Sequence, residues 1–232
     1  MRLTAKDIAR LTDISAVRTL YGEADIREMA ENAKKHAFFA VHVLPCWMSF
    51  LRSLLADTPD ILAGGPVGFP AGGHRTDIKA AEARALVADG VQEMDMMLNV
   101  GKLRSGDLRY VLEDIRTVVG SAGEVPVKVI IEAPLLSDDE IKVACDLCIQ
   151  GGAAFVKTST GWLPNGSTPQ MIRLIAAHVG QAIKIKAAGG IRDVQTVVEM
   201  LRLGVARFGI NLETAVKIVT AVAALPGGSV EV

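Results

Sequence analysis

The sequence predicts a single (β/α)8 barrel. Short apolar segments with the residue types of β-strands recur at intervals of roughly 25–30 residues, and most neighbouring segments are separated by an amphipathic helix. Ala, Val, Ile and Leu supply most of the apolar half of the chain, as in parallel strands that are covered on both faces. The expected strands lie within residues 10–15, 38–44, 62–69, 92–99, 126–132, 153–157, 182–187 and 205–209.

The ends of several helices can be identified from capping residues and glycines. Ser137 and Glu140 form a capping box, and Thr168 is followed by a proline at the first helical position. The expected helices run from Asp77 to Ala88 before Gly90, from Leu108 to Val119 before Gly120, from Ser137 to Gly151, from Thr168 to near Gly180 and from Asp193 to near Gly204.

An open doubly wound sheet is the main alternative fold. That fold usually carries G-x-G-x-x-G after its first strand, and this sequence has no such motif. No linker or low-complexity segment divides the chain, so we expect residues 1–232 to form one domain.

Composition excludes several classes of partner. The formal net charge of −1 argues against nucleic acid and anionic membranes as main partners. No apolar run is long enough to span a membrane, and the N-terminus lacks the apolar core of a signal peptide, so we expect a cytoplasmic protein.

Cys145 and Cys148 form a C-x-x-C pattern, which invites a redox or metal-binding interpretation. Together with Ile141 and Ile149, however, they fall on one face of the helix that Ser137 begins. We therefore interpret both cysteines as small core residues. The four histidines are scattered, and no Cys/His cluster has the spacing of a metal site.

Charged side chains near the carboxyl ends of the expected strands predict the functional site. Lys157 and Lys186 each end an apolar segment, and Asp95 lies in a third. In a barrel these strand ends meet at one face, where chemistry gathers. Burial and a second nearby ammonium group lower the pKa of a lysine, so we expect the two lysines to lower each other's pKa and to free a nucleophilic amine.

A lysine amine, a second lysine and a carboxylate suit Schiff-base chemistry. The amine condenses with a carbonyl, the iminium accepts electrons, and the carboxylate transfers protons. This set of residues predicts C–C bond making or breaking beside a carbonyl, without a metal or another cofactor. Two alternatives remain from residue types alone: each lysine extends to solvent from a strand end, or the charged groups form a buried ion-pair network that only fills the barrel.

The sequence resembles the deoxyribose-phosphate aldolase family of class I aldolases along nearly its whole length. The stretches that carry the resemblance are Val67–Pro70, Glu93–Gly101, Lys128–Glu132, Val156–Gly161 and Lys186–Arg192, in family order and at family spacing. The resemblance implies that Lys157 forms the Schiff base, that Lys186 lowers its pKa and that Asp95 acts in proton transfer. It also implies a TIM barrel, an aldehyde or sugar-phosphate substrate and a homodimer.

We expect a further set of residues to bind the substrate, of which Asp13 matches an aspartate of the family. They are Asp13 and Ser15 in the first strand, His42 in the second, Thr158 and Thr160 after Lys157, Gly189 and Gly190 after Lys186, and Gly209 and Asn211 near the last strand. Gly189 and Gly190 can present N–H groups to a phosphate.

Several positions depart from the family pattern. Ile210, Asn211 and Leu212 stand where small hydroxyl residues are usual, and we expect the next residue, Glu213, to point outward. His42 replaces a usual cysteine, and either contacts a substrate hydroxyl, relays a proton or is a structural histidine. Leu44 stands where the family often has a polar or aromatic residue, and we expect His74 and Arg75 in a loop to face solvent.

Three functions are compatible with these observations. The first is a class I aldolase that cleaves 2-deoxy-D-ribose 5-phosphate to acetaldehyde and D-glyceraldehyde 3-phosphate. The second is a related aldolase for a non-phosphorylated or otherwise modified sugar. The third is a catalytically inactive barrel that binds sugar phosphates.

Overall fold

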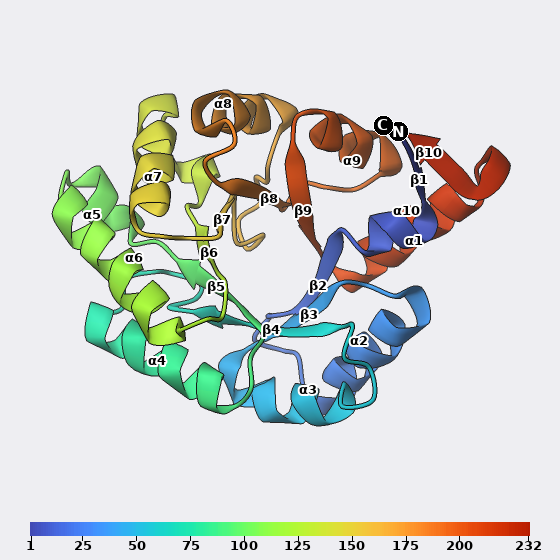
Figure 1. The fold of residues 1–232 in the computed structure, drawn as a ribbon, viewed down its shortest axis with the longest axis horizontal. Helices are drawn as coiled ribbons and strands as arrows, with labels where there is room; N and C mark the ends of the chain where they lie inside the picture. The colour runs from blue at the N-terminus through green and yellow to red at the C-terminus, as the bar shows by residue number, and fades with distance from the viewer.

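A closed barrel of eight parallel strands forms the centre of the molecule (Figure 1); the structure, a computed structural model, describes residues 1–232. Each strand pairs with the next along the chain, and the last pairs with the first, which closes the ring. The strands are β2 (Thr12–Ala16), β3 (Ala40–Val43), β4 (Leu62–Val67), β5 (Glu93–Met97), β6 (Val127–Ile130), β7 (Phe155–Lys157), β8 (Lys184–Ala188) and β9 (Val205–Ile210).

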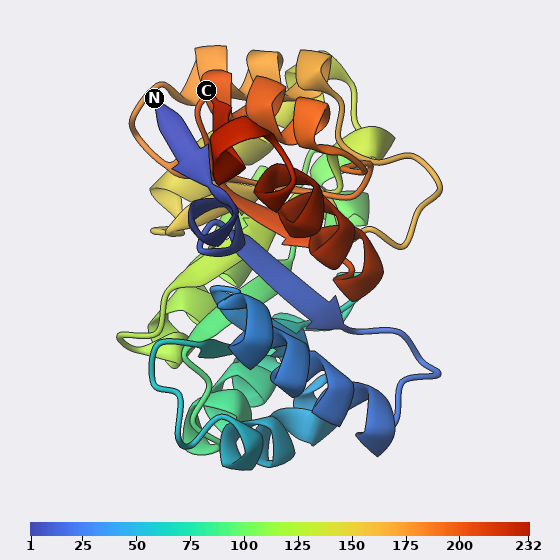
Figure 2. The same ribbon diagram turned by 90° about the vertical axis from the view of Figure 1, so that its right-hand side faces the viewer.

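Helices surround the barrel on its outside (Figures 1 and 2). Most connect one strand to the next, as the parallel pairing requires. The helices are α1 (Ala5–Ala9), α2 (Glu23–His36), α3 (Met48–Leu54), α4 (Thr76–Ala88), α5 (Val100–Arg104), α6 (Leu108–Ala122), α7 (Asp138–Gln150), α8 (Pro169–Val179), α9 (Val194–Arg202) and α10 (Leu212–Ala223). Three 3-10 turns complete the structure, at Pro45–Trp47, Ala133–Leu135 and Pro226–Gly228.

The two ends of the chain meet outside the barrel. β1 (Arg2–Thr4) and β10 (Ser229–Glu231) form an antiparallel pair, and the N-terminal amine donates a hydrogen bond to the Val232 carbonyl at 2.9 Å. Figure 1 shows the two ends next to one another at the β1–β10 pair.

The barrel predicted from the sequence is confirmed. All eight expected segments contain or overlap a barrel strand, with boundaries that differ by a few residues. The capping box at Ser137 begins α7, and Thr168 caps α8 with Pro169 at its first position. The helix expected to end at Val119 continues to Ala122, because Gly120 stays helical and the left-handed residue after the helix is Gly123.

Alternation along β5 explains why the barrel has an apolar outside and a charged inside. Met94 and Met96 belong to the apolar core between strands and helices. Glu93 and Asp95 point the other way, into the barrel, where they meet charged side chains from other strands. The apolar core therefore lies under the helices, and the barrel interior is free to hold a polar site.

Cys145 and Cys148 are buried on the core-facing side of α7, as the helical spacing predicted. Burial raises the pKa of both thiols, which favours the protonated and unreactive form.

A buried ion pair joins α4 to α6. Lys79 Nζ lies 2.5 Å from Asp114 Oδ2 and donates a hydrogen bond to the Met97 carbonyl at 2.9 Å. Both side chains are almost fully excluded from solvent. This contact fixes the two helices to the end of β5, the strand that carries Asp95.

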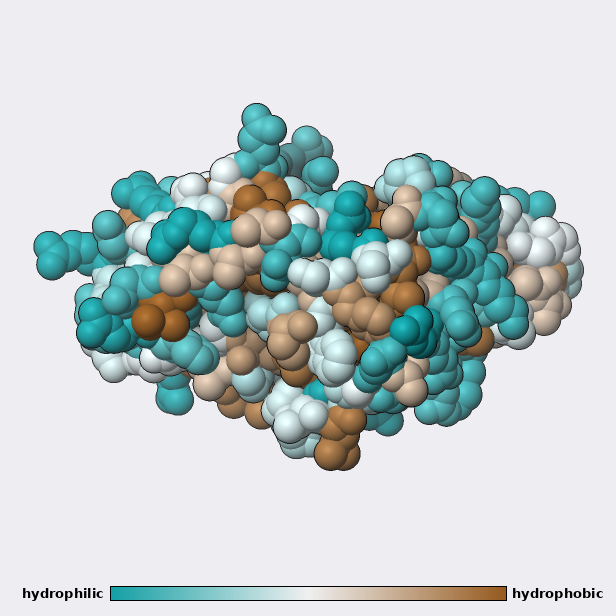
Figure 3. Space-filling view, turned by 90° about the horizontal axis from the view of Figure 1, so that it is seen from below, coloured by the Kyte–Doolittle hydropathy of each residue, from teal (hydrophilic) through white to brown (hydrophobic).

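The face of the molecule in Figure 3 mixes hydrophilic and hydrophobic side chains, with the hydrophobic atoms in several separate areas. No helix combines the length and the hydropathy that crossing a bilayer requires.

Candidate active site

A cavity of about 750 Å³ opens where the barrel strands end. Side chains from β2, β3, β5, β7 and β8 line its inner part, and the loops that follow β2, β7, β8 and β9 line its mouth. This arrangement places the functional residues at the carboxyl ends of the strands, as in other barrels of this type.

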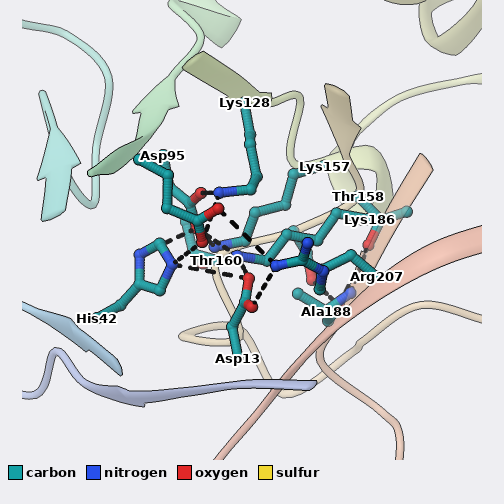
Figure 4. Close-up of polar contacts among 12 residues, drawn as sticks. Asp13, His42, Asp95, Lys128, Lys157, Thr158, Thr160, Lys186, Ala188 and Arg207 are labelled. Carbon is teal, nitrogen blue, oxygen red and sulfur yellow. Dashed lines mark hydrogen bonds and ion pairs between the residues drawn. The ribbon is translucent and has the colours of Figure 1, made fainter. Parts of the chain in front are cut away.

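Lys157, the last residue of β7, lines the cavity and is 9% exposed. Its Nζ lies 2.6 Å from Asp95 Oδ2 (Figure 4). Burial lowers the pKa of Lys157 to about 8, and the charges of Lys186 and Lys128 act in the same direction, whereas Asp95 opposes them. A substantial fraction of the amine is therefore neutral near physiological pH.

Lys186, on β8, is the second lysine in the cavity. Its Nζ lies 2.6 Å from Asp13 Oδ2 and 2.9 Å from Asp95 Oδ2. Burial alone would lower its pKa, but the charges of Asp13, Asp95 and Glu93 outweigh burial and raise it. The expectation that the two lysines lower each other's pKa is therefore wrong for Lys186, because its two closest partners are carboxylates.

Asp95 joins the two lysines. One carboxylate oxygen, Oδ2, accepts hydrogen bonds from both Lys157 and Lys186. Burial opposes ionisation, but the charges of Lys157, Lys186 and His42 dominate and hold the pKa of Asp95 well below its usual range. The carboxylate is thus ionised and lies within hydrogen-bond reach of the candidate nucleophile.

Five more side chains extend the charged cluster across the barrel. Asp13 lies 2.8 Å from Arg207, and Glu93 lies 2.8 Å from Lys128. The full cluster consists of the carboxylates of Asp13, Glu93 and Asp95, the cations Lys128, Lys157, Lys186 and Arg207, and the imidazole of His42.

The cluster holds one more basic than acidic side chain, leaving His42 aside. An uncompensated charge is costly in a buried site. The charges balance when one of the four basic groups is neutral, and Lys157 is the one whose pKa is lowered. Charge balance and burial therefore both favour the free amine of Lys157.

His42, on β3, lines the cavity and is buried among the carboxylates (Figure 4). Its Nε2 lies 2.9 Å from Glu93 Oε1, and its Nδ1 lies 3.6 Å from Asp95 Oδ2. The ring lies against Gly64, where a Cβ atom would come within 2.5 Å of three ring atoms. Glycine at this position thus makes room for the imidazole.

The two threonines after Lys157 differ in position. Thr160 lines the cavity, and its hydroxyl donates to the buried carboxylate of Glu132 at 2.6 Å. Thr158 does not line the cavity: its side chain is fully buried, against Ser167 and the Ala188 carbonyl. Thr158 directly follows Lys157, and side chains of successive residues in an extended segment point in opposite directions. Its side chain therefore lies behind the site, where it connects β7 to β8 and does not contact the cavity.

Asp13, His42 and Glu93 also offer ligand atoms within 4.8 Å of one another, the spacing that a metal ion could use. Both carboxylates already have cationic partners: Asp13 has Lys186 and Arg207, and Glu93 has Lys128. A divalent ion would add charge to a cluster that is already rich in cations, so the residues do not fit a metal site.

A family model described as DeoC/LacD family aldolase matches residues 12–210, which include all eight barrel strands. The chain belongs to this family. Curated relatives support the assignment: a deoxyribose-phosphate aldolase of Sinorhizobium medicae is 51% identical over 99% of this chain and 93% of its own length. A deoxyribose-phosphate aldolase of Klebsiella pneumoniae is 48% identical over 94% of this chain and 88% of its own length.

Solved structures agree with the family assignment. A putative deoxyribose-phosphate aldolase from Coccidioides immitis superposes with a TM-score of 0.89 at 31% identity, over 94% of this chain and 86% of its own. The deoxyribose phosphate aldolase from Aeropyrum pernix gives a TM-score of 0.87 at 26% identity, over 96% and 94% of the two chains.

The glycines and the asparagine expected to bind the substrate lie in the wall of the same cavity. Gly189 and Gly190 line it, both with a φ of +75°, which favours glycine. Gly209 also lines it, and a Cβ there would approach Lys186 Cε at 3.3 Å. Asn211 caps α10 by accepting a hydrogen bond from the Thr214 N–H at 2.9 Å, which leaves its amide N–H groups to donate.

Two predictions about side chains outside the cavity are confirmed: Glu213 points outward, and His74 and Arg75 face solvent. Glu213 points outward and pairs with Lys217 at 2.6 Å, with both side chains exposed. His74 and Arg75 are also exposed, and Arg75 pairs with Asp77. Ser15 lines the cavity, as expected.

Arg207, Arg18 and Trp162 also belong to the site or its mouth, and they were not among the residues predicted from the sequence. A signal existed for Arg207, which is a charged residue inside an apolar strand, like Asp95. Arg18 and Trp162 lie in loops, where no periodic pattern shows which way a side chain points.

Proposed function

We propose that the chain is a Schiff-base-forming class I aldolase that cleaves 2-deoxy-D-ribose 5-phosphate to acetaldehyde and D-glyceraldehyde 3-phosphate, and that catalyses the reverse reaction. The observation that carries the proposal is Lys157: a lysine with a pKa lowered to about 8, at a cavity wall and in contact with an ionised carboxylate. We take deoxyribose phosphate as the substrate because the curated relatives are named deoxyribose-phosphate aldolases.

In this proposal the neutral amine of Lys157 adds to the C1 aldehyde of the open-chain sugar. Loss of water from the carbinolamine gives a protonated iminium. A base then removes the proton of the C3 hydroxyl, the C2–C3 bond breaks, and its electron pair moves into the iminium to give an enamine. D-Glyceraldehyde 3-phosphate leaves, the enamine takes a proton at C2, and hydrolysis releases acetaldehyde and restores Lys157.

Asp95 and Lys186 assist these steps in different ways. Asp95 is ionised and lies 2.6 Å from Lys157 Nζ, so it can accept and return protons during carbinolamine and enamine formation. Lys186 stays protonated, and its charge helps to keep Lys157 neutral. The iminium regains a positive charge at Lys157, which Asp95 stabilises.

The residues proposed to bind the substrate are those that line the cavity. His42 and Ser15 lie near the reacting end and suit contacts to substrate hydroxyls, whereas Gly189 and Gly190 lie in the outer part and suit the phosphate. The cytoplasmic location and the homodimer expected from the sequence remain predictions.

The test is to supply 2-deoxyribose 5-phosphate and free 2-deoxyribose separately and to measure the acetaldehyde released by coupling it to NADH oxidation. The proposal predicts release from the phosphorylated sugar at a much higher kcat/KM, and none from the Lys157→Met variant. Faster turnover of the free sugar would favour the second function, for which the bulk of Ile210 and Leu212 beside the cavity is the supporting observation. No release from either sugar would favour a binding barrel.

A further inference from the structure

The loop between β2 and α2 carries an arginine to the mouth of the cavity. Arg18 lines the cavity, and its Nη2 donates a hydrogen bond to the Gly161 carbonyl at 2.7 Å. Its guanidinium carbon lies 5.2 Å from the centre of the Trp162 ring, a cation–π distance. Two contacts with the loop after β7 therefore fix the Arg18 side chain across the cavity mouth.

Arg18 has no acidic partner. The other cations of the cavity wall include Lys157 and Lys186, which pair with carboxylates of the barrel, and Lys217, which pairs with Glu213. No carboxylate lies within 4.0 Å of the Arg18 guanidinium, and the contact with Gly161 uses one of its five N–H donors. The side chain thus brings an unbalanced positive charge and free donors to the cavity.

Arg192 is a second unpaired arginine in the cavity wall, but nothing in the chain holds its guanidinium. A side chain that is already fixed loses less conformational entropy when it binds a ligand. Arg18 is therefore the better placed of the two for a specific contact.

The neighbouring groups of the outer cavity suit an anion. The N–H groups of Gly189 and Gly190 donate to no other group of the chain, and both residues line the same cavity as Arg18. At the start of α10, by contrast, Ile210 and Leu212 offer no side-chain donor. Backbone donors are thus present, and Arg18 supplies the fixed charge that they lack.

We propose that Arg18 determines specificity for phosphorylated substrates by forming a charge-assisted contact with the phosphate group. The inference rests on the proposed function, because the aldol substrate supplies the phosphate. The competing role for Arg18 is a tie between two loops, through Gly161 and Trp162, with no contact to the ligand.

The test compares wild type with Arg18→Gln, and with Arg109→Gln as a control that removes the same charge from the exposed surface of α6. Arg18→Gln should lower kcat/KM for 2-deoxyribose 5-phosphate about 10-fold or more, because hydrogen bonds between charged groups are the strong ones. The kcat/KM for free 2-deoxyribose should hardly change. An equal loss on both sugars would mean that Arg18 only ties the loops and would overturn the inference, as would no loss on either.

A second measurement does not depend on turnover. Inorganic phosphate is titrated into each protein by calorimetry, with borohydride trapping of acetaldehyde as the check that the barrel interior is intact. Phosphate should bind to wild type and to Arg109→Gln, and about 10-fold more weakly to Arg18→Gln. Equal binding by all three proteins, or no binding by wild type, would overturn the inference.

The two measurements separate this inference from the proposed function. If wild type cleaves neither sugar but binds phosphate through Arg18, the proposed function fails, whereas the contact between Arg18 and phosphate is supported. If wild type cleaves the phosphorylated sugar and Arg18→Gln does so equally well, the inference fails and the proposed function holds.

Discussion

Lys157 and Asp95 lie 2.6 Å apart, yet the pKa of Lys157 is lowered to about 8 rather than raised. An isolated ion pair would favour the charged amine. Here burial and the charges of Lys186 and Lys128 outweigh Asp95, which is itself shared with Lys186. The site therefore keeps a carboxylate beside the amine without locking the amine in its protonated form.

Replacing Lys157 with methionine should abolish turnover and leave the fold intact. The remaining cluster has three basic groups, Lys128, Lys186 and Arg207, against three carboxylates. In wild type below pH 8, Lys157 is protonated in both the folded and the unfolded state. Because its pKa is lower in the folded state, the protonated amine reduces the free energy of unfolding at these pH values. This loss is recovered as the pH rises from about 8 through 10.5.

We therefore expect a Tm for Lys157→Met at pH 7 that equals or exceeds that of wild type, measured by calorimetry. The difference should diminish toward pH 10. A large loss of stability at pH 7 would mean that the protonated amine of Lys157 stabilises the fold as a partner of Asp95 and is not an excess positive charge.

The pH dependence of Schiff-base formation should follow the free amine of Lys157. The rate of trapping with acetaldehyde is expected to rise about tenfold per pH unit and to level off above pH 8. In Lys186→Met the inflection should move to higher pH, because the charge of Lys186 is one cause of the lowered pKa. An inflection that stays in place or moves down would remove Lys186 from this role.

Asp95→Asn should separate Schiff-base formation from turnover. Asp95 raises the pKa of Lys157, so its neutralisation should lower that pKa further and leave the amine reactive. Turnover should fall by about 10²-fold or more, since the group that transfers protons is lost. Rapid-quench measurement of the trapped adduct, beside steady-state kcat, checks both effects; full activity would show that another group transfers the protons.

The contributions of Lys79 and Asp114 to the free energy of unfolding should depend on each other, because the two side chains form a buried ion pair. Lys79→Met leaves the Asp114 carboxylate without its cation in the interior, which typically costs about 3–5 kcal/mol. The double variant Lys79→Met, Asp114→Leu should be less destabilised than the single one, although the Met97 carbonyl also loses a donor. Urea denaturation of wild type, of the single variants Lys79→Met and Asp114→Leu, and of the double variant measures this; a double variant that loses the sum of both single effects would contradict it.

Much of the fold and the reactive end of the site could be predicted from the sequence because their signals are periodic. Asp95 alternates with methionines in β5, and such a position can only face the barrel interior. The same rule applied to Arg207 in β9 would have placed it in the cluster.

Other features depend on contacts between residues that are distant in the sequence. The pKa of Lys186 is raised because Asp13 lies 2.6 Å away, on a strand at the other end of the chain. The pairing of β1 with β10 likewise joins the two termini, and each strand is only three residues long. Arg18 reaches the cavity from a loop, where neither helical nor strand spacing applies.

The most direct test is to incubate the protein with acetaldehyde and borohydride, and to determine the intact mass and the modified peptide. We expect one reductively ethylated residue, Lys157, with Lys186 unmodified because its pKa is raised and its amine stays protonated. Lys157→Met should give no adduct. Modification of Lys186 in preference to Lys157, or no adduct on wild type at pH 8, would show that Lys157 is not the nucleophile of this site.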